Sequence, residues 1–116
     1  MDTVSNYTET LEKTVRDLLE RQDDLIRTAF TDQLTGLGNR GGFARSLEEL
    51  WEQDTPVTMA FIDIDNLKHC NDVFGHDEGN RYILQVSLYL KLYMKVDEAA
   101  FRIGGDEFAI LSTIAT

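Results

Sequence analysis

The sequence predicts an α+β domain that is preceded by a coiled-coil helix, and three observations lead to this fold class. Residues 1–30 carry apolar side chains at heptad spacing. The rest of the chain shows patterns in the order helix, strand, helix, helix, strand, strand, which is typical of helices packed on an antiparallel sheet. A Gly-Gly pair between the last two strands predicts a β-hairpin. With 116 residues, the chain has room for one domain with a modest core.

Residues 1–30 are predicted to form one helix with a coiled-coil seam. The seam repeats every seven residues and has two polar interruptions. It consists of Val4, Thr8, Leu11, Val15, Leu18, Gln22, Leu25 and Ala29. We expect this helix to pair with a second copy and so to form a homodimer. The alternative is an amphipathic helix packed on its own domain.

Residues 32–40 should end this helix, because glycine and asparagine in this segment favour turns. A second helix is predicted over residues 40–53, with its apolar and aromatic side chains in the core. These side chains are Phe43, Leu47, Leu50 and Trp51.

Residues 57–62 form a nearly continuous apolar run, which predicts a central strand. A short helix over residues 66–71 should close near Gly75, and a longer helix is expected over residues 77–93. The core candidates on the longer helix are Ile83, Leu84, Val86, Leu88, Leu90 and Leu92.

Carboxylates gather at two predicted strand ends. Asp63 and Asp65 end the central strand, where buried acids are costly unless a metal ion or hydrogen-bond donors meet them. Asp106 and Glu107 follow the Gly-Gly pair, whose glycines can adopt the positive φ angles of tight turns. Adjacent like charges repel, so we expect a hard cation with oxygen ligands to offset the pair at the hairpin tip.

Composition excludes several classes of protein. The net charge of −10 argues against nonspecific nucleic-acid binding, which needs a basic surface. One cysteine, Cys70, cannot form an internal disulfide and fits a reducing cytosol. No apolar run approaches the length of a membrane span, and no signal peptide is visible. We expect a cytoplasmic chain without membrane contact, while membrane tethering of a longer parent protein stays open.

Three stretches resemble the motifs of the GGDEF family, the diguanylate cyclases, in the family's order and with compatible spacing. They are residues 32–40, residues 61–76 and the hairpin residues 102–111, which include Gly-Gly-Asp-Glu-Phe. The resemblance implies a partial palm, like that of nucleotidyl cyclases and polymerases, over residues 31–116. It implies a signalling helix over residues 1–30. It also implies that the domain is C-terminally truncated, because the family's domain continues past the hairpin.

The reaction implied by this resemblance joins two GTP molecules into cyclic di-GMP, with Mg²⁺ or Mn²⁺, in a dimer whose two sites face each other. Asp63 and Asp106 match the family's side-chain metal ligands, and Ile64 would contribute its backbone carbonyl. The end of the central strand and the hairpin tip must therefore lie side by side. Asp106 is also the implied general base, and Glu107 would assist with metal binding or hydroxyl activation.

The same resemblance implies residues that hold GTP, with phosphates approaching the backbone at the paired glycines. The implied set is Lys68, Asn71, His76, Asn80, Gly104 and Gly105. Three of these have structural alternatives: Lys68 as a solvated helix residue, Asn71 as a helix cap and His76 as a structural hydrogen-bonding group.

Two departures from the family pattern stand out. Lys95 and Glu98 occupy positions where many members carry the arginine and aspartate of an inhibitory product-binding site. Asn80 stands where the family usually has an aspartate that binds guanine. This second departure keeps an alternative function open, namely a regulatory module that binds GTP or dimerises without turnover.

Overall fold

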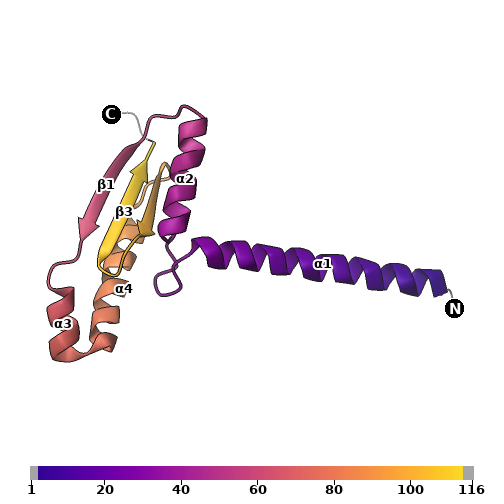
Figure 1. Ribbon diagram of the computed structural model, residues 1–116, viewed down its shortest axis with the longest axis horizontal. Helices are drawn as coiled ribbons and strands as arrows, with labels where there is room; N and C mark the ends of the chain where they lie inside the picture. The colour runs from indigo at the N-terminus through magenta and orange to yellow at the C-terminus, as the bar shows by residue number, and fades with distance from the viewer. Residues whose placement is uncertain (1–2, 114–116) are drawn as a thin grey trace.

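The computed structural model describes residues 3–113, in which a long helix leads into a small α+β body (Figure 1). The three strands form an antiparallel sheet in the order β1-β3-β2, and β2 and β3 form the predicted hairpin. The elements are α1 (Thr3–Phe30), α2 (Arg40–Glu52), β1 (Thr58–Asp63), α3 (Leu67–Phe74), α4 (His76–Tyr93), β2 (Glu98–Arg102) and β3 (Glu107–Ser112). The predicted order of elements is confirmed; Met1 and Asp2 of the predicted first helix, and residues 114–116 of the predicted domain, lie outside the described residues.

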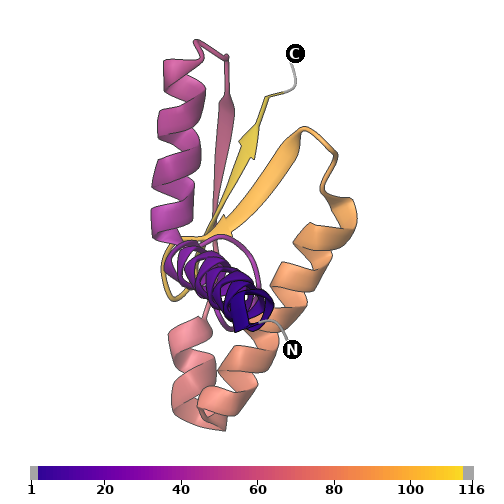
Figure 2. The same cartoon turned by 90° about the vertical axis from the view of Figure 1, so that its right-hand side faces the viewer.

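Helices cover both faces of the sheet, and Figure 2 shows α2 and α4 on opposite sides of it. Successive side chains of a strand point to opposite faces. Phe108 of β3 therefore packs with Ile83 and Leu90 of α4 in the main core. On the other face, the ring of Phe43 in α2 lies edge-on to that of Phe101, with ring centroids 5.5 Å apart. This two-sided packing explains the continuous apolar run of β3.

The helix α1 extends away from the rest of the molecule (Figure 1). It has no buried residue, and even the seam residues Leu11 and Leu18 are 52% and 58% exposed. The alternative in which α1 packs on its own domain is therefore wrong for this structure. No helix within residues 3–113 combines the length and the apolar character that a membrane span requires.

The strand β1 lies at an edge of the sheet rather than in its centre, so that prediction is wrong for the described residues. Its only partner strand within residues 3–113 is β3, which takes the central position. Phe61 is 63% exposed although the apolar run of β1 predicts burial on both faces. A strand is buried on both faces only where both are covered, and residues 3–113 leave much of β1 uncovered.

Four of the predicted core side chains are exposed. Trp51 lies in the last turn of α2 at the margin of its apolar face, and 83% of its surface is accessible. On α4, the buried residues Ile83 and Leu90 share one face. The other three exposed residues are Leu84, Leu88 and Leu92. They follow one another at four-residue spacing on another side of α4.

Glycines are needed at some turns and not at others. Gly75 ends α3 with a φ of 92°, and Gly36 has a φ of 75°, where side chains are disfavoured. Gly104 and Gly105 of the hairpin do not adopt a positive φ, so the expected reason for this pair is wrong. The hairpin loop is wider than a two-residue turn, because Arg102 and Phe108 are its last paired residues.

Gly38 is expected to be intolerant of a side chain. A Cβ atom at this position would lie 2.7 Å from Cε1 of Phe101, a buried ring that is already packed against Phe43. We expect Gly38→Ala to lower the free energy of unfolding by about 1 to 3 kcal/mol, the cost typical of overpacking. Urea denaturation would measure it.

The matched control is Gly105→Ala, because a Cβ atom there meets nothing within 4 Å in the described part of the chain. Its free energy of unfolding should stay close to that of the wild type. Equal stabilities of the two variants would show that the ring of Phe101 moves aside.

Candidate functional site

Three carboxylates converge where β1 ends and β3 begins. Asp63 is the last residue of β1 and pairs across the ladder with Glu107, the first residue of β3. Asp106 precedes Glu107 at the hairpin tip. One oxygen atom from each of the three can be chosen so that all lie within 4.8 Å of one another. The prediction that the strand end and the hairpin tip lie side by side is confirmed.

The carboxylate cluster fits a hard divalent cation. All three side chains are exposed, so they can reach an ion and solvent without unfolding. Carboxylate oxygens are the ligands that Mg²⁺, Mn²⁺ and Ca²⁺ prefer. Ile64 is buried beside the cluster, and its N–H donates a hydrogen bond of 2.8 Å to the carbonyl oxygen of Asp106. This bond fixes the hairpin tip against the end of β1.

The loop next to the carboxylates is open to a ligand. A Cβ atom at Gly105 would meet nothing within 4 Å, and one at Gly104 would be in ordinary contact with Glu107 at 3.5 Å. Because neither glycine has a positive φ, the fold of the described residues does not require glycine at these positions. Gly104 is half-buried and Gly105 is exposed, so solvent reaches the backbone of this loop.

The remaining predicted residues lie on α3 and α4, which sit at the same end of the sheet as the hairpin tip (Figure 1). Lys68, His76 and Asn80 are exposed. Asn71 is half-buried between the two helices, where a Cβ atom at Gly79 would lie 2.8 Å from its Cγ atom. The structure thus places the carboxylates of the hairpin tip and the candidate residues of α3 and α4 at one end of the sheet. Both groups were predicted from the sequence motifs.

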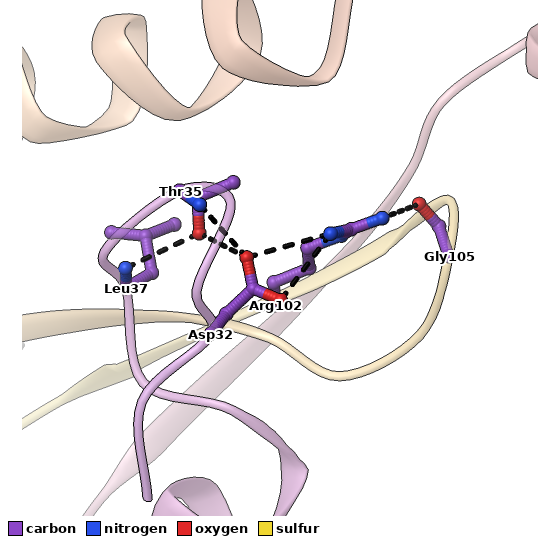
Figure 3. Close-up of polar contacts among 5 residues, drawn as sticks. All are labelled: Asp32, Thr35, Leu37, Arg102 and Gly105. Atoms are coloured by element: carbon purple, nitrogen blue, oxygen red, sulfur yellow. Dashed lines mark hydrogen bonds and ion pairs between the residues drawn. The ribbon is translucent and has the colours of Figure 1, made fainter. Parts of the chain in front are cut away.

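A polar network centres on Arg102, which the sequence patterns did not identify as a functional residue (Figure 3). The Nη1 group of Arg102 lies 3.3 Å from Oδ1 of Asp32, and both side chains are mostly buried, at 16% and 19% exposure. The Nη2 group donates a hydrogen bond of 3.0 Å to the carbonyl oxygen of Gly105. A sequence feature that could have predicted this network is the position of a charged residue, Arg102, within the apolar hairpin strands.

Asp32 is held by the turn that follows α1. Its Oδ2 atom accepts hydrogen bonds from the hydroxyl of Thr35 at 2.7 Å and from the N–H of Thr35 at 2.9 Å. Burial by itself would raise the pKa of the Asp32 carboxyl. The bonds from Thr35, together with the charge and hydrogen bond of Arg102, outweigh burial and hold the pKa of Asp32 below its ordinary value of 3.8.

Comparison with known proteins identifies a family match and several relatives. The model of the GGDEF family, described as "Diguanylate cyclase, GGDEF domain", matches residues 29–116. Diguanylate cyclase DgcP of Escherichia coli K12 is 38% identical over 105 residues, which cover 87% of this chain and 31% of DgcP. Diguanylate cyclase DgcN of the same strain is 38% identical over 97 residues, which cover 81% of this chain and 24% of DgcN. The chain therefore spans less than a third of the length of either relative.

Among solved structures, the coiled coil and GGDEF domain of DgcB from Caulobacter crescentus, in complex with c-di-GMP, is similar throughout this chain. The TM-score is 0.87 at 30% sequence identity, and the match covers 99% of this chain and 63% of the DgcB chain. The similarity therefore includes the long helix α1 as well as the α+β body.

The acid stability of the chain should depend on Asp32. Because its pKa is lower in the folded state than in the unfolded chain, ionised Asp32 stabilises the fold fully above pH ~3.8. That stabilisation is lost as the pH falls through the lower, folded-state pKa. We expect Asp32→Asn to lower the free energy of unfolding by about 1 to 3 kcal/mol near neutral pH, and the difference from the wild type to shrink below pH ~3.8.

Urea denaturation across this pH range would test the expectation. Asp24→Asn is the matched control, since it removes an exposed ion pair with Arg27, and its effect should be small at every pH. A difference between the wild type and Asp32→Asn that stays constant through acid would contradict the role of the Asp32 charge.

Proposed function

The chain belongs to the GGDEF family, and from this membership we propose that it is a diguanylate cyclase domain, which condenses two GTP molecules into cyclic di-GMP within a homodimer. The observation that carries the proposal is the convergence of Asp63, Asp106 and Glu107 beside an open Gly104–Gly105 loop. Carboxylates that can hold a divalent cation next to a backbone that admits phosphate suit phosphoryl chemistry on a nucleotide.

We propose that Asp63 and Asp106 hold Mg²⁺ or Mn²⁺ through their side chains and that Ile64 contributes its backbone carbonyl. A cation bound there would neutralise phosphate charge and lower the pKa of the attacking hydroxyl. Asp106 is also the proposed general base that accepts the proton of the 3′-hydroxyl of one GTP as this oxygen attacks the α-phosphate of the other, and pyrophosphate leaves. Glu107 assists at the same cation or hydroxyl.

The proposed nucleotide contacts come from the loop and from α3 and α4. Gly104 and Gly105 let the phosphates approach the backbone, and Lys68 adds a positive charge that reaches solvent at the start of α3. The base and sugar are assigned to the residues at the junction of α3 and α4. These residues are Asn71, His76 and Asn80.

The proposed domain division assigns residues 1–30 to a coiled-coil signalling helix and residues 31–116 to the GGDEF domain. The exposed seam of α1 supports pairing with a second copy of the chain, because an apolar stripe of this length is unfavourable in water. Pairing would also bring together the two GTP molecules that the reaction needs.

One residue favours a second candidate function, a GGDEF module that binds GTP or dimerises without turnover. Asn80 replaces the aspartate expected at a guanine-contacting position. An aspartate accepts hydrogen bonds from both guanine donors, whereas the amide of Asn80 offers one acceptor oxygen. Weak or unselective GTP binding would leave a regulatory role for the same fold.

Turnover tests the proposal directly. The protein that carries this domain, incubated with GTP and Mg²⁺, should form cyclic di-GMP, and Asp106→Asn should lower the rate by at least about 100-fold, because it removes both a ligand and the base. Chromatographic detection of cyclic di-GMP would measure the rate.

The matched control for this assay is Asp54→Asn. Asp54 lies in the loop before β1, at the opposite end of this strand from Asp63, and its positive φ of 52° is one that asparagine tolerates. GTP binding without any cyclic di-GMP would favour the regulatory module, and equal activity of Asp106→Asn would exclude the proposed site.

The dimer has its own test. We expect the wild-type chain to have a mass in solution of about twice 13.2 kDa and Leu18→Asp to have half that mass, because a charge in the seam opposes pairing. Light scattering would measure both. Asn6→Asp, which adds the same charge on the helix face away from the seam, should stay dimeric. A monomeric wild type, or a dimeric Leu18→Asp, would exclude pairing through α1.

A further inference from the structure

Arg102, the last residue of β2, joins two parts of the molecule that lie far apart in the sequence. Its guanidinium group contacts Asp32 in the turn after α1 and the carbonyl oxygen of Gly105 at the hairpin tip (Figure 3). We propose that Arg102 is a positioning residue for the metal site: held by Asp32, it fixes the Gly105–Asp106 peptide and thereby aims the Asp106 carboxylate. This inference rests on the metal site of the proposed function.

The guanidinium group is suited to this task because it is planar and presents its donors in a rigid fork. Nη1 of Arg102 lies 3.3 Å from Oδ1 and 3.4 Å from Oδ2 of Asp32, while Nη2 donates to Gly105 at 3.0 Å. Nε of Arg102 is buried and has no hydrogen-bond partner among residues 3–113. Because an unpaired buried donor is unfavourable, the Nη contacts with Asp32 and Gly105 have to offset this cost and hold the group in place.

The contact with Gly105 acts on Asp106 through the peptide between them. The carbonyl of Gly105 and the N–H of Asp106 belong to one planar unit, so a hydrogen bond to that carbonyl restricts the plane. On the other side of Asp106, its own carbonyl accepts the hydrogen bond from Ile64. Both peptides that flank the Cα atom of Asp106 are therefore held. This fixes the direction of its Cα–Cβ bond although Gly105 is intrinsically flexible.

Hydrogen bonds hold the Asp32 carboxylate in the position where it contacts Arg102. Thr35 donates two hydrogen bonds to its carboxylate, and the carbonyl of Thr35 in turn accepts a hydrogen bond from Nζ of Lys91 in α4. The backbone N–H of Arg102 also donates to the carbonyl of Gly38 at 2.8 Å. The turn, the end of α4 and the end of β2 thus form one connected support for the hairpin tip.

The affinity of the full 116-residue chain for Mn²⁺ alone tests the proposal, measured by electron paramagnetic resonance of free Mn²⁺. We expect Arg102→Lys to weaken Mn²⁺ binding by about 10- to 100-fold, the usual effect of losing a residue that orients a metal ligand. Lysine keeps the positive charge, so the long-range field at the site is unchanged, but its ammonium group is a point charge without the planar fork.

Three further variants separate positioning from general stability. Asp32→Asn should weaken Mn²⁺ binding in the same direction, and the double variant should be no weaker than Arg102→Lys alone, because both act on one carbonyl. Arg45→Lys is the control: this arginine forms an exposed ion pair with Glu49, and the variant should bind Mn²⁺ like the wild type. Thermal unfolding of each variant, followed alongside, confirms that affinities refer to folded protein.

The outcomes distinguish the positioning role of Arg102 from the proposed metal site on which it rests. A wild-type chain that binds no Mn²⁺, or that keeps its affinity in Asp106→Asn, would overturn the metal site and with it this inference. Binding that is lost in Asp106→Asn but unchanged in folded Arg102→Lys would overturn the positioning role alone. If Arg102→Lys does not fold, an unchanged Mn²⁺ affinity in Asp32→Asn would overturn the positioning role. If neither variant folds, the role of the pair is purely structural and the positioning role is overturned as well.

Discussion

The register between β1 and β3 is the constraint on which the rest of the site depends. It places Ile62 opposite Phe108, whose side chain is completely buried, and Asp63 opposite Glu107. A shift of one residue would turn Phe108 out of the core, so the packing of this ring excludes the alternative registers. The same register brings the acids at the strand end to the hairpin tip. The carboxylate cluster is therefore a consequence of core packing rather than of any attraction between the acids.

Charged residues connect this sheet to the turn after α1. The ion pair between Asp32 and Arg102 spans 70 residues of sequence and is mostly buried. Removing one partner of such a pair leaves a charge with poor solvation, so the pair resists separation even where its net contribution to stability is small. Because Asn39 also bonds the carbonyl of Ala29 at 2.9 Å, the end of α1 is attached to the same turn. The support of the hairpin tip thus begins at the end of α1.

The glycines of this chain serve two different purposes. Gly38 lets its strand-like segment pass close to the ring of Phe101, and Gly75 adopts a backbone conformation that ends α3. Gly104 and Gly105 satisfy neither need in the described residues. Neither has a positive φ, and a Cβ atom would make only an ordinary contact with Glu107 at Gly104 and none within 4 Å at Gly105. A pair of glycines without a role in the fold, placed next to three carboxylates, is consistent with a backbone that must be approached by a ligand.

The sequence by itself determined the order of the helices and strands, the heptad seam of α1 and, through family motifs, the approach of Asp63 to Asp106. These features follow from local periodicity or from motif spacing, which a sequence carries directly. Only the tertiary structure decided that β1 lies at an edge, that Trp51 is exposed and that Arg102 bonds both Asp32 and Gly105. Burial depends on which surface another element covers, and a contact across 70 residues depends on the packing of the whole sheet, so neither is encoded in local periodicity.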